Sequence, residues 1–170
     1  TPYSVSAHML YENTNPYKLY EPGGYLDVTN SKYKIEDYMH HNYIGGWWGF
    51  PFHISSLEQT YDRVMNGGVS FRKKKFMIDI IENKLEEYLA RGGNPCEDYF
   101  VSACVTDRPK VKEVLSFSID SSYMYPLDDN APFGLHKPWG VPGKENSGQY
   151  YTQIKRVCDD VEILEELHNV

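Results

Sequence analysis

The sequence has little cysteine, no long apolar run and no segment with the pattern of a secretory signal. Its three cysteines, Cys96, Cys104 and Cys158, are an odd number and form no CxxC pair. Free thiols in a reducing compartment are therefore the simplest interpretation, and a disulfide scaffold is not expected. No apolar run approaches the roughly 20 residues of a membrane span. These absences predict a cytoplasmic protein without a membrane span.

Basic charge is also scarce. The 170 residues include 17 Lys and Arg against 24 Asp and Glu, a net charge of −7, and residues 72–75 (RKKK) are a local exception. A surface that binds phosphate backbones needs a basic field, so no nucleic-acid partner is expected.

Aromatic side chains are abundant, with 15 Tyr, 7 Phe and 3 Trp. Tyr and Trp combine a flat apolar face with a hydrogen-bonding tip, which suits a surface that binds partly polar ligands such as sugars. The same residues suit a wet protein interface or a half-formed core. The hydrophobic fraction of 41% and the charged fraction of 24% are typical of a globular chain, and the length suits one domain.

Periodicity and turn signals predict an α/β or α+β order of strand, helix, helix, strand, long loop and helix. Helical spacing of apolar residues predicts a helix from about Lys74 to Arg91, ended by Gly92 and Gly93. Asn94 is the predicted N-cap of a short second helix. The remaining predicted elements are short strands or irregular structure over 1–34, one or two helical turns over 35–41, strands at 43–48, 69–71 and 115–120, a loop over 121–147 and a final helix over 148–168.

Two short motifs in the first half carry possible chemistry. In residues 66–72 (NGGVSFR), Gly67 and Gly68 let the backbone pass close to a bulky group, although a tight turn before an edge strand explains them equally well. Glu97 and Asp98 open the second predicted helix, where the helix dipole stabilises carboxylates whatever their role. Their functional reading is a base that accepts a proton from an attacking hydroxyl, or a carboxylate that binds a sugar hydroxyl.

A third motif is the loop 131–140 (APFGLHKPWG). His136 is a suitable ligand for a divalent metal, and Lys137 is a point-charge partner for phosphate. Pro138 restricts the backbone of Lys137 to extended geometry. An exposed turn with Trp139 packed into the core is the structural alternative.

These motifs, with residues 35–48, resemble a family of glycosyltransferase-like domains of unknown function. In that family a DYIGAPW segment is followed by a GNGGLSLR strand, an EDVFF helix start and a GFHKPW loop. The corresponding segments here are 35–48, 66–72, 97–100 and 133–139, in the same order. The resemblance implies a GT-A-type, Rossmann-like α/β domain with helices packed on a small mixed sheet, which transfers a sugar from a nucleotide-sugar donor to a glycan or other acceptor.

The resemblance also implies roles for individual residues. By similarity to the HxxGxxKPW element of glycogenin-type transferases, His136 would bind Mn²⁺ or Mg²⁺ and Lys137 would hold the diphosphate, with Trp139 in the same loop. Three further residues would line a sugar: Asn66, Gly67 and Gly68. Asp98 would be the base of an inverting reaction, with Glu97 as the substitute candidate.

The chain departs from the transferase pattern at its front. No Asp-x-Asp element precedes Ile35, so the domain is expected to be partial and to occupy residues 35–170. Residues 1–34 instead resemble the AHMLYENADP…EPGG.LD run of acyclic terpene utilisation proteins, and form a separate segment in this interpretation. Two other functions therefore stay open: a non-catalytic remnant that binds carbohydrate or a partner, and a fragment of a terpenoid or acyl-CoA catabolic protein.

Overall fold

The computed structural model describes residues 4–5, 18–21, 24–27, 32–48, 56–120 and 132–136, and the side chains of all but the first three ranges. The predicted final helix over 148–168, Cys158, Lys137 and Trp139 lie outside the described residues.

Seven strands form one sheet with the order β1-β5-β4-β6-β7-β3-β2. Strand β4 pairs with β5 in antiparallel orientation and with β6 in parallel, and β6 pairs with β7 in parallel. The sheet is mixed and curled, because β5 contacts β7 although two strands lie between them. The strands are β1 (Ser4–Val5), β2 (Lys18–Glu21), β3 (Gly24–Asp27), β4 (Tyr43–Trp47), β5 (Met65–Arg72), β6 (Ser118–Asp120) and β7 (Gly134–His136).

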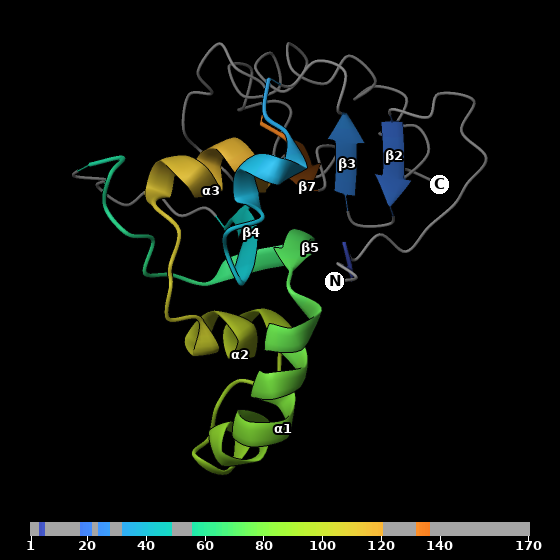
Figure 1. Cartoon of the computed structure of the whole chain (residues 1–170). Helices are drawn as coiled ribbons and strands as arrows, with labels where there is room; N and C mark the ends of the chain where they lie inside the picture. Colours follow the sequence, from blue (N-terminus) through green and yellow to red (C-terminus); the bar gives the residue numbers. More distant parts are fainter. Residues whose placement is uncertain are drawn as a thin grey trace, which may run out of the picture.

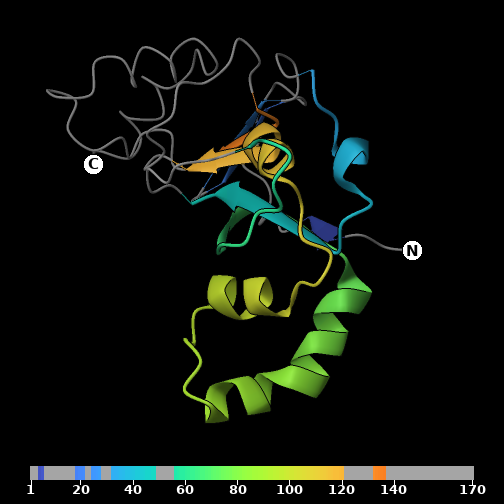
Figure 2. The same ribbon diagram turned by 90° about the vertical axis from the view of Figure 1, so that its left-hand side faces the viewer.

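Helices pack on the strands from two sides (Figures 1 and 2). Helices α1 (Lys74–Ala90) and α2 (Glu97–Cys104) contact each other, and α2 packs on β5. Helix α3 (Val111–Phe117) lies on the other side, against β4 and β6, and the 3₁₀ helix η1 (Ile35–Tyr38) precedes β4. The predicted α/β class, with helices packed on a mixed sheet, is therefore confirmed.

The core lies between these helices and the central strands. Tyr43, Phe71 and Phe117 are among its largest fully buried side chains. The ring of Phe117 stacks on Phe133, with centroids 5.7 Å apart, and meets Tyr38 edge-on at 4.9 Å. This aromatic packing joins η1, α3 and the segment before β7, so part of the aromatic content of the chain serves the core.

Helix α1 extends away from the core (Figure 2). Only Ile80 is buried among its side chains, while Ile78, Ile81 and Leu89 are exposed. The prediction of this helix is confirmed, and Gly92, with φ of 80°, has the left-handed conformation expected after its end. Within the described part of the chain, no helix has the length and apolar composition needed to cross a membrane.

Three predictions about local structure are wrong. The predicted strand 115–120 is in fact the end of α3 followed by β6. The N-cap of α2 is Cys96, and Asn94 instead accepts a hydrogen bond from the Cys96 backbone at 2.9 Å in the preceding turn. The segment Gly134–His136, predicted as loop, is strand β7, because its backbone pairs with β6 and β3.

Candidate functional site

A bulge in β5 forms the centre of the candidate site. Ser70 pairs with Gly45, but the next pair joins Asn66 to Gly46, so residues 67–69 have no partner on β4. The Gly68 N–H donates to Asn66 Oδ1 at 2.7 Å, and Ser70 Oγ donates to the Gly67 carbonyl at 3.0 Å. Bulges of this kind often redirect side chains beside active sites. Asn66 and Ser70 are buried, so both contribute to the internal order of the bulge.

Asp120 and His136 meet beside the bulge, at the ends of two parallel strands. They are paired across β6 and β7, and His136 Nδ1 donates to Asp120 Oδ2 at 2.5 Å. Asn66 Nδ2 donates to the same oxygen at 3.2 Å. Each of the two paired side chains is less than a tenth exposed. With the proton on Nδ1, the lone pair of the His136 ring is on Nε2, which lies against the backbone of Gly68.

The two glycines bring the remaining groups close to this pair. A methyl group at Gly68 would overlap the His136 ring, and one at Gly67 would overlap Asp98 Oδ1 and Arg72 Nη2. Consecutive residues of a strand point to opposite sides. The backbone of Gly67 and Gly68 therefore lies between Asp98 and His136. Because neither glycine has a Cβ atom, both side chains can pack against this backbone.

Asp98 is an unusual carboxylate. It is 9% exposed, and its Oδ1 is buried without a hydrogen-bond partner in the described structure. Burial, with the negative charge of Glu97 as the next cause, raises the pKa of Asp98 to about 6, although the positive charge of Arg72 acts in the opposite direction. Arg72 is itself held by Ser70 Oγ at 2.9 Å and by Glu97 at 3.4 Å. A carboxyl group with this pKa exchanges protons near neutral pH.

The structure thus brings together the predicted residues that it describes: Asn66, Gly67, Gly68, Glu97, Asp98 and His136. Lys137 and Trp139 lie outside the described residues, so their predicted roles stay predictions. Asp120 and Arg72 were not predicted as site residues. The available signal for Asp120 was a carboxylate at the end of a predicted strand, where ligands of parallel sheets bind.

The fit of a divalent metal can be judged from His136. Metal-binding histidines usually donate their second ring N–H to a carboxylate, as His136 does to Asp120. Within the described ranges, however, no group of three metal-ligating side chains includes His136. His136 alone would give a divalent ion one protein ligand, so substrate phosphates and water would have to supply most of the others.

Two pockets lie near the helices. One, of about 460 Å³, is lined by Trp48, Tyr99, Asp62, Arg63 and Val64, with the Trp48 and Tyr99 rings in edge contact at 5.7 Å. Tyr99 directly follows Asp98 in α2, but consecutive helix residues point in different directions, and none of the predicted site residues lines this pocket.

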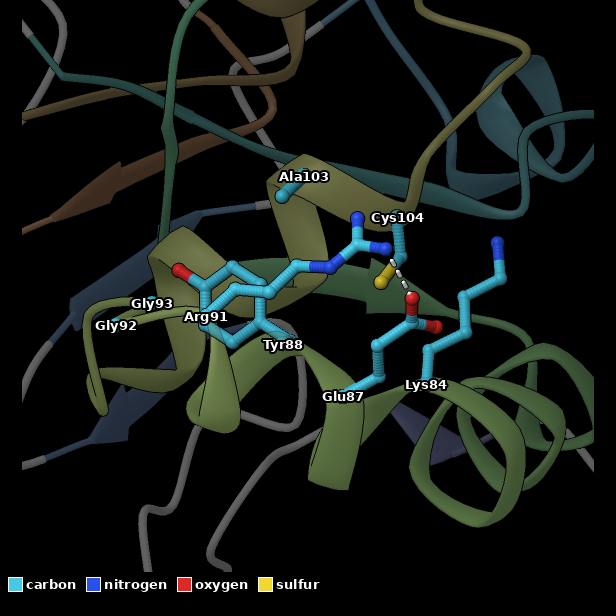
Figure 3. Close-up of a pocket in the computed structure, with 8 residues that line it drawn as sticks. All are labelled: Lys84, Glu87, Tyr88, Arg91, Gly92, Gly93, Ala103 and Cys104. Atoms are coloured by element: carbon cyan, nitrogen blue, oxygen red, sulfur yellow. Dashed lines mark ion pairs between the residues drawn. The ribbon is translucent and has the colours of Figure 1, made fainter.

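The other pocket, of about 410 Å³, lies between α1 and α2. Figure 3 shows the ion pair of Arg91 with Glu87 along the α1 side of it and the Tyr88 ring at its wall. None of the predicted site residues lines this second pocket, so it is separate from the bulge of β5.

Comparison with known proteins gives a family but no activity. Residues 7–136 match the model of a family described as a protein of unknown function (DUF5672). No curated protein and no solved structure matches the chain. The match extends across residue 34, and the predicted division of the chain into 1–34 and 35–170 stays a prediction.

Proposed function

Since the chain belongs to the DUF5672 family, whose function is unknown, we propose its activity from the site itself: transfer of a sugar from a nucleotide-sugar donor to an acceptor hydroxyl, in a partial GT-A-type domain. The observation that carries the proposal is the placement of Asp98 and the Asp120–His136 pair on the two sides of the bare backbone at Gly67 and Gly68.

The position of the site in the sheet supports this activity. Strands β4, β6 and β7 run parallel, and Asp120 and His136 are the last residues of their strands. Asn66 pairs with Gly46 near the end of β4, so it lies at the same edge. Ligands of α/β sheets bind outside the carboxyl ends of parallel strands. This edge is therefore the expected position of the donor nucleotide.

Asp98 is the proposed base. Its raised pKa makes it a stronger base than an ordinary Asp. The pocket lined by Trp48 and Tyr99 offers aromatic faces to an acceptor sugar. Glu97 is more exposed and pairs with Arg72, which suits it to position that guanidinium and to set the charge around Asp98.

On the other side of the glycines, Asp120 orients His136 so that Nε2 can coordinate Mn²⁺ or Mg²⁺ bound to the diphosphate. When bound, such an ion stabilises the negative charge that develops on the leaving nucleoside diphosphate. Asn66 fixes both Asp120 and the Gly68 N–H, so it couples the geometry of the bulge to that of the imidazole. Lys137, next in the chain, is the proposed partner of the diphosphate.

The test is calorimetric titration of the protein with UDP and GDP, each with and without Mn²⁺. Binding that requires the metal and is lost in His136→Ala is the expected result. Metal-dependent binding without donor turnover would favour the non-catalytic carbohydrate-binding alternative. Absence of binding in every combination would contradict the proposal and return attention to the terpenoid or acyl-CoA alternative.

A further inference from the structure

A second cluster of histidine and carboxylate lies between the segment before β4 and helix α3. His40 Nε2 and His41 Nε2 are each 3.2 Å from the same atom, Glu113 Oε1. The centroids of the two imidazole rings are 3.9 Å apart. The three ligand atoms all lie within 4.8 Å of one another. From these positions we propose that His40, His41 and Glu113 bind a zinc-class divalent ion, independently of the sugar-transfer site.

The distances suit a tetrahedral ion. Zn²⁺ bonds to imidazole nitrogen and carboxylate oxygen are about 2.0 to 2.1 Å, so neighbouring corners of its tetrahedron are about 3.3 Å apart. The distances of 3.2 Å from Glu113 Oε1 to the Nε2 atoms of the two histidines therefore correspond to two edges of such a tetrahedron. Two imidazoles and one carboxylate form a common ligand set for Zn²⁺, with a fourth corner open to water.

The surrounding contacts hold each ligand in place. Glu113 Oε2 accepts the Lys110 N–H at 2.7 Å, which leaves Oε1 to face the two histidines. The backbone of His41 donates to the Tyr38 carbonyl at 3.1 Å, and Lys73 Nζ donates to the His40 carbonyl at 3.0 Å. Outer contacts that fix ligand orientation are typical of metal sites.

Exposure differs among the three ligands in a way that allows an ion to enter. The His41 side chain is 7% exposed, Glu113 is 25% exposed and His40 is 60% exposed. The ion can reach the buried pair from the side of His40.

The bound ion would act as a structural clamp. His40 and His41 directly precede β4, whereas Glu113 belongs to α3, which leads directly into β6. The cluster lies before the first residue of β4 and at the first turn of α3, away from Asp120 at the end of β6. An ion there would fasten the segment before β4 to the helix that leads into β6.

The test uses the metal alone, without nucleotide. After treatment with a chelator, the protein is titrated with Zn²⁺ in competition with a chromophoric chelator, and with Co²⁺, whose visible absorption reports tetrahedral coordination. One ion per chain is expected. His40→Ala and Glu113→Gln are expected to weaken binding by about tenfold or more. Gln at 113 keeps an oxygen for the Lys110 N–H, so the start of α3 is preserved.

The matched control is His136→Ala, which removes an imidazole from the sugar-transfer site and should leave the Zn²⁺ affinity unchanged. Three results would overturn the inference: no tight Zn²⁺ binding by the parent protein, equal affinity in the two cluster variants, or loss of the ion in His136→Ala. Because no nucleotide is present, failure here is distinct from failure of the proposed transferase activity.

Discussion

In the described part of the chain, histidine is paired with carboxylate in two places, and these differ in which polar atoms they leave without a partner. At the ends of β6 and β7, His136 is bound to Asp120, while the nearby Asp98 keeps a buried oxygen without a partner in the described structure. At the start of β4, His40 and His41 share one oxygen of Glu113, whose other oxygen is capped by a backbone N–H. Within the described residues, the first cluster therefore contains a buried oxygen without a hydrogen-bond partner and the second does not.

That difference agrees with the two roles that we propose, a reaction site for the first cluster and a structural site for the second. A buried carboxylate with a raised pKa destabilises the folded state at neutral pH, and such a cost is expected where a group must exchange protons with a substrate. Ligands held by outer hydrogen bonds around a common point serve to fix geometry. Variants that each change one residue can test this comparison, and each is measured against a second variant or the parent protein.

Asp98→Asn should have the largest effect. We expect sugar transfer to fall by about 10²- to 10⁴-fold, because the amide cannot accept the proton, while donor binding changes little. Donor turnover measured by nucleoside diphosphate release checks this. Glu97→Gln is the control, since the Glu97 side chain is 60% exposed and should matter less. Full activity in Asp98→Asn would show that Asp98 is only a helix-start carboxylate.

Asp120→Asn should weaken metal-dependent nucleotide binding. The substitution removes the anionic acceptor that fixes the His136 tautomer, so the affinity for UDP or GDP in the presence of Mn²⁺ should fall by about 10- to 100-fold. Calorimetry measures the loss. Glu113→Gln, in the other cluster, should bind the nucleotide like the parent. An equal loss in both variants would mean that the two clusters are not independent.

Gly68→Ala should destabilise the fold around the first cluster. Its methyl group would overlap the His136 ring, and we expect the free energy of unfolding to fall by about 1 to 3 kcal/mol in urea titration. Gly92→Ala is an informative comparison, because nothing lies within 4 Å of its added methyl group and the cost comes from φ of 80° alone, about 1 kcal/mol. Unchanged stability of Gly68→Ala would contradict the close packing of His136.

The pH dependence of stability should show the smallest effect. The folded-state pKa of Asp98, about 6, is above its usual value of 3.8, so the folded protein binds this proton more tightly than the unfolded chain. The resulting stabilisation is complete below pH 3.8 and is lost as the pH rises through 6. In thermal unfolding, the free energy of unfolding of Asp98→Asn relative to that of the parent should therefore rise by about 1 to 2 kcal/mol from pH 4 to pH 7, after allowance for solvent screening. If the difference in free energy of unfolding between variant and parent did not change with pH, Asp98 would be more solvated than the structure indicates.

Sequence periodicity predicted α1 well, because its apolar residues recur at helical spacing and Gly92 ends it. It failed at α3, where residues 115–120 alternate in polarity as a strand does. There the helical signals were Val111, Val114 and Phe117 at spacings of three, with Glu113 placed to accept the Lys110 N–H. Tertiary burial of these three side chains determined the outcome, and a short helix offers few periods by which it can be recognised.

Motif types predicted much of the candidate site, because a diglycine at a strand and a carboxylate pair at a helix start are local patterns. The partnership of Asp120 with Asn66 and His136 was not predictable in this way. The hydrogen bond from Asn66 to Asp120 spans 54 positions in the chain, and it depends on a bulge that no local pattern specifies. The number of unpaired residues in that bulge decides which side chains face His136.

The order of the strands also has a consequence for synthesis on the ribosome. The cluster of His40, His41 and Glu113 can form once residue 113 has emerged, whereas the other cluster waits for His136. At about 5 to 20 residues per second, the gap is about 1 to 5 s. During that interval β6 has no β7 beside it, and its open edge is a surface to which a second nascent chain can add. A chaperone that covers sheet edges would act on this protein within that interval.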